Sequence, residues 1–166
     1  MNVDPYDHDT QQLRTAFAKF PSGVATIAAS IHGEPTVLVA SSFTVGVSLD
    51  PPLVSFSVQR TSTTWPDLAQ AASLGVSLLG SGHDKTCRQL AAKEKAGRFD
   101  GIEVSTSSTG AIFIHGSPVW MECTIEDQHQ AGDHDIVVLR VTGLAHVDNV
   151  TALVFHESRF KAIAVS

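Results

Sequence analysis

The sequence predicts a mainly β protein whose antiparallel strands form a closed or partly closed barrel with helices at its periphery. Short apolar runs with strand character outnumber the three helical patterns. The two kinds of element do not alternate as β-α-β units, which disfavours a parallel, doubly wound sheet. The run at 135–147 is apolar on both faces, whereas an antiparallel strand with one face in water alternates more cleanly. We therefore expect the outer surface of the barrel to meet a helix or a second subunit.

The N-terminal region is predicted to contain a tail, a helix and a β-hairpin. Residues 1–9 are polar and acidic and are expected to be a flexible tail. Thr10 can cap a helix over 10–20, where apolar side chains recur at helical spacing until a Pro-Ser-Gly sequence stops it. Strands are then predicted at 24–29 and 36–40, joined by a connection that contains glycine and proline.

The middle of the chain is predicted to contain a rigid turn, a strand and a short helix. Asp50 precedes two prolines, which cannot donate to the ladder of a central strand. A strand follows at 53–58, and then a hydroxyl-rich bend at 61–64. Pro66 fits the first turn of a helix over 66–72.

The C-terminal half is predicted to consist mostly of strands. After a strand at 74–79, Asp84 can cap a helix over 84–96 that Gly97 ends. Residues 105–109 are expected to be a mobile loop. Later strands are predicted at 112–114, 118–128 and 135–147, with a final edge strand at 152–155. Residues 10–166 are expected to form one domain, because no repeat or linker interrupts them.

Composition excludes several classes of protein. Only 17% of the residues are charged, which suggests that a second chain covers part of the surface, and the net charge of −6 makes nucleic-acid binding unlikely. The longest apolar run, 136–139, is far too short to span a membrane. The N-terminus does not resemble a signal peptide. The two cysteines form no C-x-x-C pair and are expected to be buried free thiols, so we expect a cytoplasmic protein.

Common catalytic and binding motifs are absent from the sequence. It contains no G-x-G-x-x-G fingerprint, no phosphate-binding P-loop and no G-x-S-x-G elbow. No metal is expected, because the closest histidine pair, His129 and His134, would face opposite sides of a strand and lacks further ligands. A serine hydrolase that uses His134 and Asp133 has no nucleophile signal.

Four segments resemble, in order, the flavin reductase family with the FMN-binding split-barrel fold. Members of this family are the small reductase components of two-component flavin-dependent monooxygenases. The likeness extends over residues 13–163, and the segments that carry it are 17–26, 39–54, 93–101 and 132–136. The second segment, V-A-S-S-F-T-V-G-V-S-L-D-P-P-L-V, is the most specific. It departs from the commoner family form at Val39, where threonine is usual, and by one additional residue between Phe43 and Asp50.

The resemblance places the flavin ring at the end of the strand predicted at 36–40. Hydroxyl and amide groups there can bond the polar edge of a flavin. An ordinary turn capped by hydroxyl groups would use the same residues and is the alternative. The candidates from this motif are Ser41, Ser42, Phe43, Thr44 and Asp50.

The hydroxyl-rich bend is the candidate phosphate site. Arg60 supplies positive charge, while hydroxyls and loop amides at a helix start favour an anion; a plain helix cap is the alternative. Lys93 and Arg98 can add charge for this phosphate or for the adenosine part of a second nucleotide, although Lys93 equally suits a solvated helix end. The candidates in the bend are Gln59, Arg60, Thr61, Ser62 and Thr64.

His134 is the candidate catalytic residue. The resemblance places it near the flavin and the incoming nicotinamide, where it can orient the carboxamide or stabilise charge on reduced flavin. The alternative is a strand-end histidine bonded to Asp133 or Asp135. Residues 156–160 weakly resemble the nicotinamide-side segment of the family, and within them Arg159 and Phe160 are further binding candidates.

The resemblance implies an NAD(P)H-dependent flavin reductase. The expected flavin is FMN or FAD, NADH or NADPH is the expected co-substrate, and a separate monooxygenase is expected to receive the reduced flavin. A homodimer is also implied and would explain the low charge. Two alternatives remain open: a split-barrel flavoprotein that keeps a tightly held FMN and reduces another substrate, and a non-enzymatic flavin-binding module.

Overall fold

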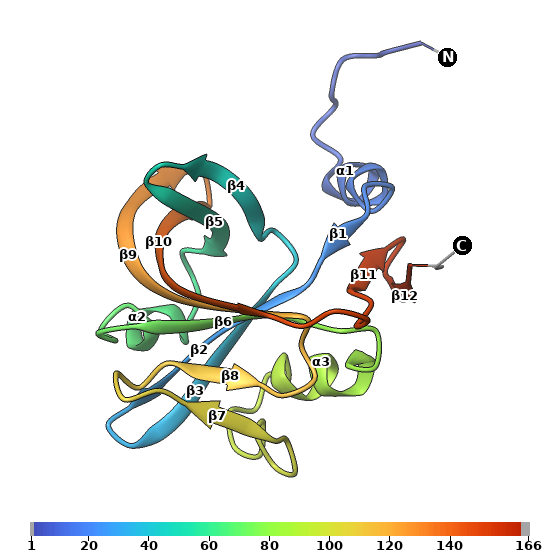
Figure 1. Ribbon diagram of the computed structural model, residues 1–166. Helices are drawn as coiled ribbons and strands as arrows, with labels where there is room; N and C mark the ends of the chain where they lie inside the picture. The colour runs from blue at the N-terminus through green and yellow to red at the C-terminus, as the bar shows by residue number, and fades with distance from the viewer. Residues whose placement is uncertain (1, 164–166) are drawn as a thin grey trace.

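The computed structural model describes residues 2–163, and its largest element is a seven-stranded antiparallel sheet with the order β3-β2-β6-β9-β10-β5-β4. Its strands are β2 (Ala25–Ile31), β3 (Glu34–Ala40), β4 (Thr44–Leu49), β5 (Pro52–Gln59), β6 (Leu74–Leu78), β9 (Val119–Ala131) and β10 (His134–His146). The sheet curls in Figure 1, and β5 contacts β3 across the opening. This open antiparallel barrel confirms the predicted fold class.

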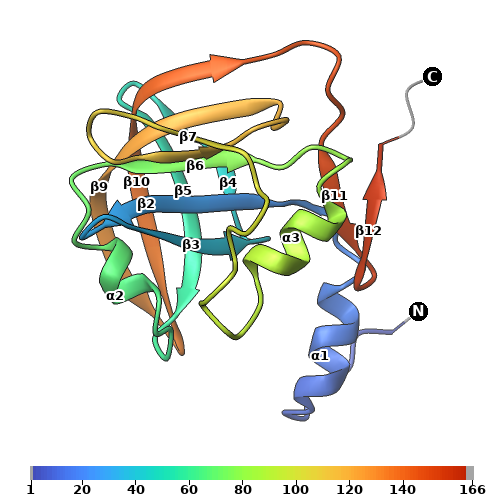
Figure 2. The ribbon, with the colours of Figure 1, turned by 90° about the horizontal axis from the view of Figure 1, so that it is seen from below.

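Two smaller sheets and three helices flank the barrel in the described residues. The smaller sheets pair β7 (Val104–Thr106) with β8 (Ile112–Ile114), and β11 (Leu153–His156) with both β1 (Ser22–Gly23) and β12 (Arg159–Ala162). The helices are α1 (Thr10–Phe17), α2 (Trp65–Leu68) and α3 (Asp84–Leu90). Figures 1 and 2 show α1 and the β1-β11-β12 sheet on one side of the barrel, with α3 beside β11. No helix in residues 2–163 has the length and apolar composition needed to cross a membrane.

The apolar core has one part inside the barrel and another between the barrel and α3. Inside, Phe56 packs edge-on against Trp65, with ring centroids 5.3 Å apart. In the second part, Cys87 of α3 packs in the same cluster as Leu153 of β11. Both cysteines are free and buried, as the sequence predicts, and burial raises the pKa of Cys87 to about 11 and that of Cys123 to about 12. Both thiols are therefore protonated at neutral pH.

The first helix differs from its prediction at both ends. Asp9 rather than Thr10 is the cap, because its carboxylate accepts hydrogen bonds from the backbone N–H groups of Gln11 and Gln12. The helix ends at Phe17, and residues 18–20 continue only as a hydrogen-bonded turn. Residues 2–9 before it form no helix or strand; residue 1 of the predicted tail and residues 164–166 of the predicted domain lie outside the described residues.

The third helix is much shorter than predicted. His83 rather than Asp84 occupies the cap position, and the helix runs from Asp84 only to Leu90 instead of 96. Beyond it, the guanidinium of Arg98 donates to the carbonyl of Ala92, and Gln89 Nε2 donates to the carbonyls of residues 97, 98 and 100. These bonds to backbone carbonyls hold the chain in non-helical turns. Gly97 has a φ of +77° within those turns, so it does not end the helix as predicted.

Four strands lie where the sequence patterns predict none, and one of them is the two-residue β1 in the Pro-Ser-Gly sequence after the first helix. β4 and β12 are short exposed strands, and β7 occupies the start of the loop predicted to be mobile. The irregular register of β4, where Gly46 has a φ of +70°, removes the alternation that would reveal a strand. β11 is the central strand of its sheet rather than the predicted edge, because β1 and β12 pair on either side of it.

The two faces of β10 are buried to different extents. Val137 and Leu139 are fully buried inside the barrel, whereas Ile136 on the opposite face is 39% exposed. Within residues 2–163 no helix therefore covers Ile136, and of the two covers predicted from the sequence, a helix or a second subunit, the second stays a prediction. The β9-β10 ribbon extends to a turn at Gly132 and Asp133, which brings His134 to the end of β10 beside Gln59 of β5.

Candidate active site

A cavity of about 570 Å³, which we call the bend cavity, gathers most of the predicted phosphate and catalytic residues. It lies where β3, β5, the hydroxyl-rich bend and the turns after α3 converge. Because Lys93 and Arg98 both line it, positive charge collects there in a chain whose net charge is −6. The lining consists of Leu38, Val39, Ser57, Val58, Gln59, Thr61, Ser62, Thr63, Thr64, Lys93, Arg98 and His134.

The bend keeps its shape through a local hydrogen-bonded turn. Ser62 Oγ accepts from the backbone N–H groups of Thr64 and Trp65, at 3.3 and 3.1 Å. The cap position of α2 is Thr64, which makes no side-chain cap bond, so Ser62 fixes the turn that leads into the helix and is not itself its cap. Because α2 is only four residues long, its dipole is small. The hydroxyl and amide groups of the bend, rather than the helix, would therefore supply most of the attraction for an anion.

The turns after α3 contribute Lys93 and Arg98 and so form the cationic wall of the bend cavity. Arg98 Nη1 donates to the carbonyl of Val37 at 3.1 Å, and Arg98 Nε donates to that of Ala92 at 2.9 Å. The Arg98 guanidinium is thus bonded to the protein itself on two sides and braces the wall. Lys93 projects from the same turns and lines the cavity.

His134 lines the bend cavity and is bonded to its sequence neighbour. Its Nδ1 lies 2.7 Å from Asp133 Oδ1, and this hydrogen bond lowers the pKa of the Asp133 carboxyl. Because a carboxylate can only accept, Nδ1 carries the proton, and Nε2 is the ring atom left for another partner. The peptide of Asp133 also accepts a hydrogen bond from the backbone N–H of Arg60, at 3.1 Å.

A second cavity of about 480 Å³, the helix cavity, contains the hydroxyl motif after β3. Ser42 Oγ accepts from the backbone N–H of Ser57 at 3.0 Å and donates to its carbonyl at 3.1 Å. Since Ser57 lines the bend cavity and Ser42 the helix cavity, the two cavities adjoin at this pair. The helix cavity is lined by Phe17, Phe20, Pro21, Ser22, Gly23, Ser41, Ser42, Phe43, Thr44 and Val45.

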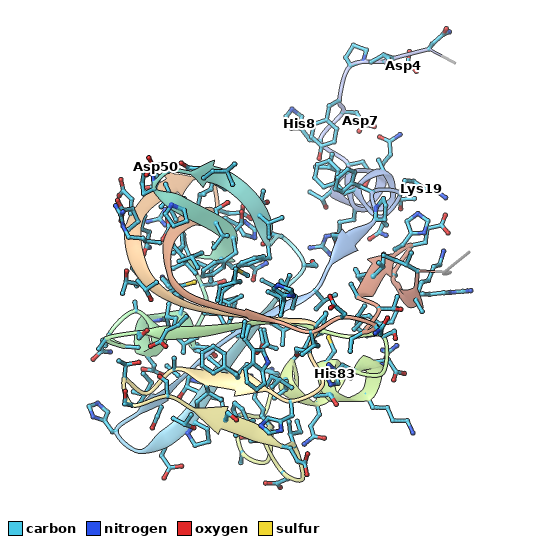
Figure 3. All side chains as sticks on the ribbon, viewed as in Figure 1. Asp4, Asp7, His8, Lys19, Asp50 and His83 are labelled. Atoms are coloured by element: carbon cyan, nitrogen blue, oxygen red, sulfur yellow. The ribbon has the colours of Figure 1, made fainter. Side chains whose placement is uncertain are left out.

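Four predicted residues line neither cavity. Arg60 is adjacent to the bend cavity, with Nε 3.9 Å from Asp135 Oδ1. Figure 3 shows Asp50 at the β4–β5 turn, far from His83 at the start of α3. Arg159 and Phe160 belong to β12, where the Phe160 ring packs against Phe155 and under the guanidinium of Arg88. The fold of this chain therefore does not bring Asp50, Arg159 or Phe160 to the cavities.

The cavities also include residues that the sequence reasoning did not select. Ser57 was detectable, because it alternates along β5 with the buried Val54, Phe56 and Val58. Thr63 belongs to the same hydroxyl run as its selected neighbours. Phe17 of α1 and Phe20 in the turn after it gave no such signal, because only the tertiary structure brings them to the same cavity as Thr44 and Val45 of β4.

The residues of the two cavities suit a phosphorylated flavin chemically. Apolar and aromatic walls with a few hydroxyl groups match a flat ring that has polar edges. Hydroxyl groups beside a lysine match a phosphate. Among residues 2–163, no group of three or more histidine, cysteine, aspartate or glutamate side chains is placed to hold a metal.

Comparisons with known proteins agree with this chemistry. A family model described as "Flavin reductase like domain" matches residues 17–164. The reductase subunit of a flavin-dependent monooxygenase from Rhodococcus jostii is 28% identical over 155 residues, which cover 93% of this chain and 78% of that protein. An NADH:FMN oxidoreductase from Rhodococcus qingshengii is 34% identical over 152 residues, which cover 89% of this chain and 78% of that protein.

A solved structure is similar over nearly its whole length. The NADH:FAD oxidoreductase of Streptomyces globisporus, in complex with NAD and FAD fragments, has a TM-score of 0.89 and 32% sequence identity to this chain. The match covers 99% of this chain and 97% of that one. The resemblance detected in the four sequence segments is thereby confirmed, and the chain belongs to the flavin reductase family.

Proposed function

We propose that this protein is an NAD(P)H-dependent flavin reductase that supplies reduced FMN or FAD to a separate monooxygenase. The observation that carries the proposal is the bend cavity, which combines a hydroxyl-rich bend, a lysine and a histidine in a chain of this family. A relative that is the reductase subunit of a flavin-dependent monooxygenase supports the partner. Relatives that use NADH with FMN or FAD support the two nucleotides.

The two adjoining cavities suggest how the flavin is held. The hydroxyl groups of Thr61 and Ser62, with Lys93, would hold its phosphate in the bend cavity. Ser41 and Thr44 in the helix cavity would hold the polar edge of its ring. The flavin would cross the Ser42–Ser57 hydrogen-bonded pair between them. In this arrangement Arg98 would hold the turns after α3 in place and contribute positive charge, while Lys93 and the hydroxyl groups would be the main phosphate ligands.

His134 is proposed to act on the nicotinamide side of the flavin. The reaction moves a hydride from nicotinamide C4 to flavin N5, and closeness of the two rings supplies most of the rate enhancement. With its Nδ1 proton bonded to Asp133, neutral His134 can orient the carboxamide by accepting a hydrogen bond at Nε2, whereas only the protonated imidazolium can donate from Nε2 toward negative charge on the reduced flavin. Its bond to Asp133 fixes the ring orientation for either task.

We further propose that the protein is a cytoplasmic homodimer. Large apolar side chains on β4 and in the turn after α1 are exposed in the single chain, and they include Leu49 at 88% and Phe20 at 78%. An exposed strand with apolar side chains is a typical contact surface for a second copy. Such a contact lies next to the helix cavity, which contains Phe17, Phe20 and Val45.

The proposal is tested by following NADH and NADPH absorbance anaerobically with FMN, FAD and riboflavin. The wild-type protein should oxidise at least one nicotinamide with saturation in flavin and should release the reduced flavin. His134→Ala should lower kcat by about tenfold or more while retaining flavin binding, because a single stabilising donor is lost. His129→Ala is a matched control, since His129 also pairs with an aspartate, Asp127, on the same ribbon but outside the cavity.

The possible outcomes test the reductase activity and the catalytic role of His134 independently. An unchanged rate in His134→Ala would remove this histidine from the mechanism and leave the reductase assignment in place. A wild-type protein that neither quenches flavin fluorescence nor accelerates NADH or NADPH oxidation would overturn the proposed function.

A further inference from the structure

Lys95 connects the two walls of the bend cavity. It lies in the turns after α3, and its Nζ donates to the carbonyl of Thr63 in the bend at 2.8 Å. The same Nζ lies 3.3 Å from Asp67 Oδ2 in α2. Lys95 does not itself line the cavity, whereas Thr63 of the bend and Lys93 of the turns after α3 both line it.

The cationic wall has little regular structure, so side-chain bonds determine its position. Gln89 and Arg98 bond carbonyls within the turns, and Arg98 also reaches Val37 of β3. None of these bonds reaches the hydroxyl-rich bend. Among the hydrogen bonds of residues 2–163, only those of Lys95 join the turns at 91–101 to the bend and α2.

The Lys95–Thr63 bond also orients a peptide of the bend. The Thr63 carbonyl points to Lys95, while the N–H of the same peptide, at Thr64, points to Ser62 Oγ. The peptide plane is therefore fixed from both sides. A charge-assisted bond of this kind is roughly twice as strong as a neutral one.

We propose that Lys95 is a positioning residue that sets the distance between the Lys93 wall and the hydroxyl-rich bend, and thereby favours phosphorylated flavins over riboflavin. This inference rests on the proposed function and concerns the same cavity. Because Lys95 acts at the part of the site proposed to bind the phosphate, its loss should weaken the binding of FMN and FAD. The residues of the helix cavity that are proposed to bind the ring should be unaffected.

The test compares FMN, FAD and riboflavin in the wild type and in Lys95→Met. The Kd of each flavin is measured by fluorescence quenching, and KM and kcat are measured with NADH. In Lys95→Met the Kd and KM for FMN and FAD should rise about tenfold, since one charge-assisted bond is lost. The kcat at saturating FMN and the Kd for riboflavin should change by less than about twofold.

Three further variants distinguish the positioning role of Lys95 from a general effect of removing a positive charge. Lys85→Met removes the same charge from α3 away from both cavities and should leave every Kd unchanged. Lys95→Arg keeps a charged donor and should recover most of the FMN affinity. Asp67→Asn removes only the exposed ion pair with Lys95 and should change the Kd for FMN by less than about threefold.

Two results would overturn the inference. One is an FMN Kd in Lys95→Met equal to that of the wild type. The other is an equal rise in the Kd values for FMN and riboflavin. This would mean that Lys95 stabilises the whole cavity and has no specific effect on phosphate binding. Failure of the proposed function is a separate result, because then the wild-type protein itself would not bind flavin or oxidise NADH.

Discussion

Glu122 of β9 joins hydroxyl groups from two distant parts of the chain. Its Oε1 accepts from Ser73 Oγ at 2.9 Å, before β6, and from Ser107 and Thr109 in the loop between β7 and β8. These bonds lower the pKa of Glu122, and the bond from Thr109 is the largest cause. One carboxylate therefore holds a loop that the sequence predicts to be mobile.

Glu122→Gln should make the protein less stable at neutral pH and less sensitive to acid. A carboxyl whose pKa is lowered by folding stabilises the folded state above its unfolded pKa, and this stability is lost as pH falls through the folded value. Urea unfolding at pH 7 should give a loss of about 1 kcal/mol in the variant. The difference between the wild type and the variant should shrink as pH falls below the ordinary glutamate pKa and should vanish in acid once pH is below the lowered pKa of Glu122.

The matched control for this variant is Glu94→Gln in the exposed turns after α3, which should leave the free energy of unfolding unchanged at both pH values. If Glu122→Gln kept the full difference from the wild type in acid, the ionised carboxylate would not be what holds the loop.

At the scale of elements, the crossing of β6 over β8 depends on Gly75. A Cβ at this position would overlap the backbone carbonyl oxygen of Ile112. The same crossing is held by Ser77 Oγ, which accepts from the backbone N–H of Ile114 at 2.9 Å. The β7-β8 hairpin can cover this end of the barrel only because β6 has no side chain at the closest point.

Gly75→Ala should therefore destabilise the protein by about 3 kcal/mol, because backbone atoms must move to admit the methyl group. Thermal unfolding should show a clear drop in Tm, or the protein should fail to accumulate in folded form. Gly82→Ala is the matched control, since nothing lies within 4 Å of a Cβ there. A Gly75→Ala variant as stable as Gly82→Ala would contradict the close crossing.

The helices show how far local sequence patterns predict the positions and the ends of elements. Apolar spacing correctly placed α1, proline in the first turn placed α2, and the acidic residue Asp84 after a glycine-rich break placed the start of α3. Their ends were predicted poorly, because bonds from Gln89 and Arg98 to backbone carbonyls ended α3. Such bonds join residues whose spacing carries no helical or strand period.

At the scale of the whole molecule, the proposed dimer makes a specific prediction. Val47→Lys places a charge on the exposed apolar strand β4 and should convert a dimer into a monomer, as measured by light scattering during size-exclusion chromatography. Val3→Lys in the exposed residues before α1 is the matched control and should remain dimeric. A wild-type protein that elutes with the mass of one chain would contradict the dimer.

The sequence by itself determined the fold class, the family and the chemical groups of the two segments that we propose bind the flavin. Hydrophobic periodicity and proline positions are local, so strands such as 53–58 could be read directly. The candidate residues Thr61, Ser62, Lys93, Arg98 and His134 were also selected from sequence, and the structure brings all five to one cavity. Their roles in binding and catalysis remain proposals.

Only the tertiary structure decided which groups are already engaged and which residues meet. It showed that Arg98 is bonded to carbonyls of the protein, that Lys95 crosses to Thr63, and that Arg159 lies apart from the cavities. The physical reason is that these contacts join residues about 30 to 60 positions apart in the chain. Local propensity fixes what a side chain can do, whereas barrel closure and register fix which partner it reaches.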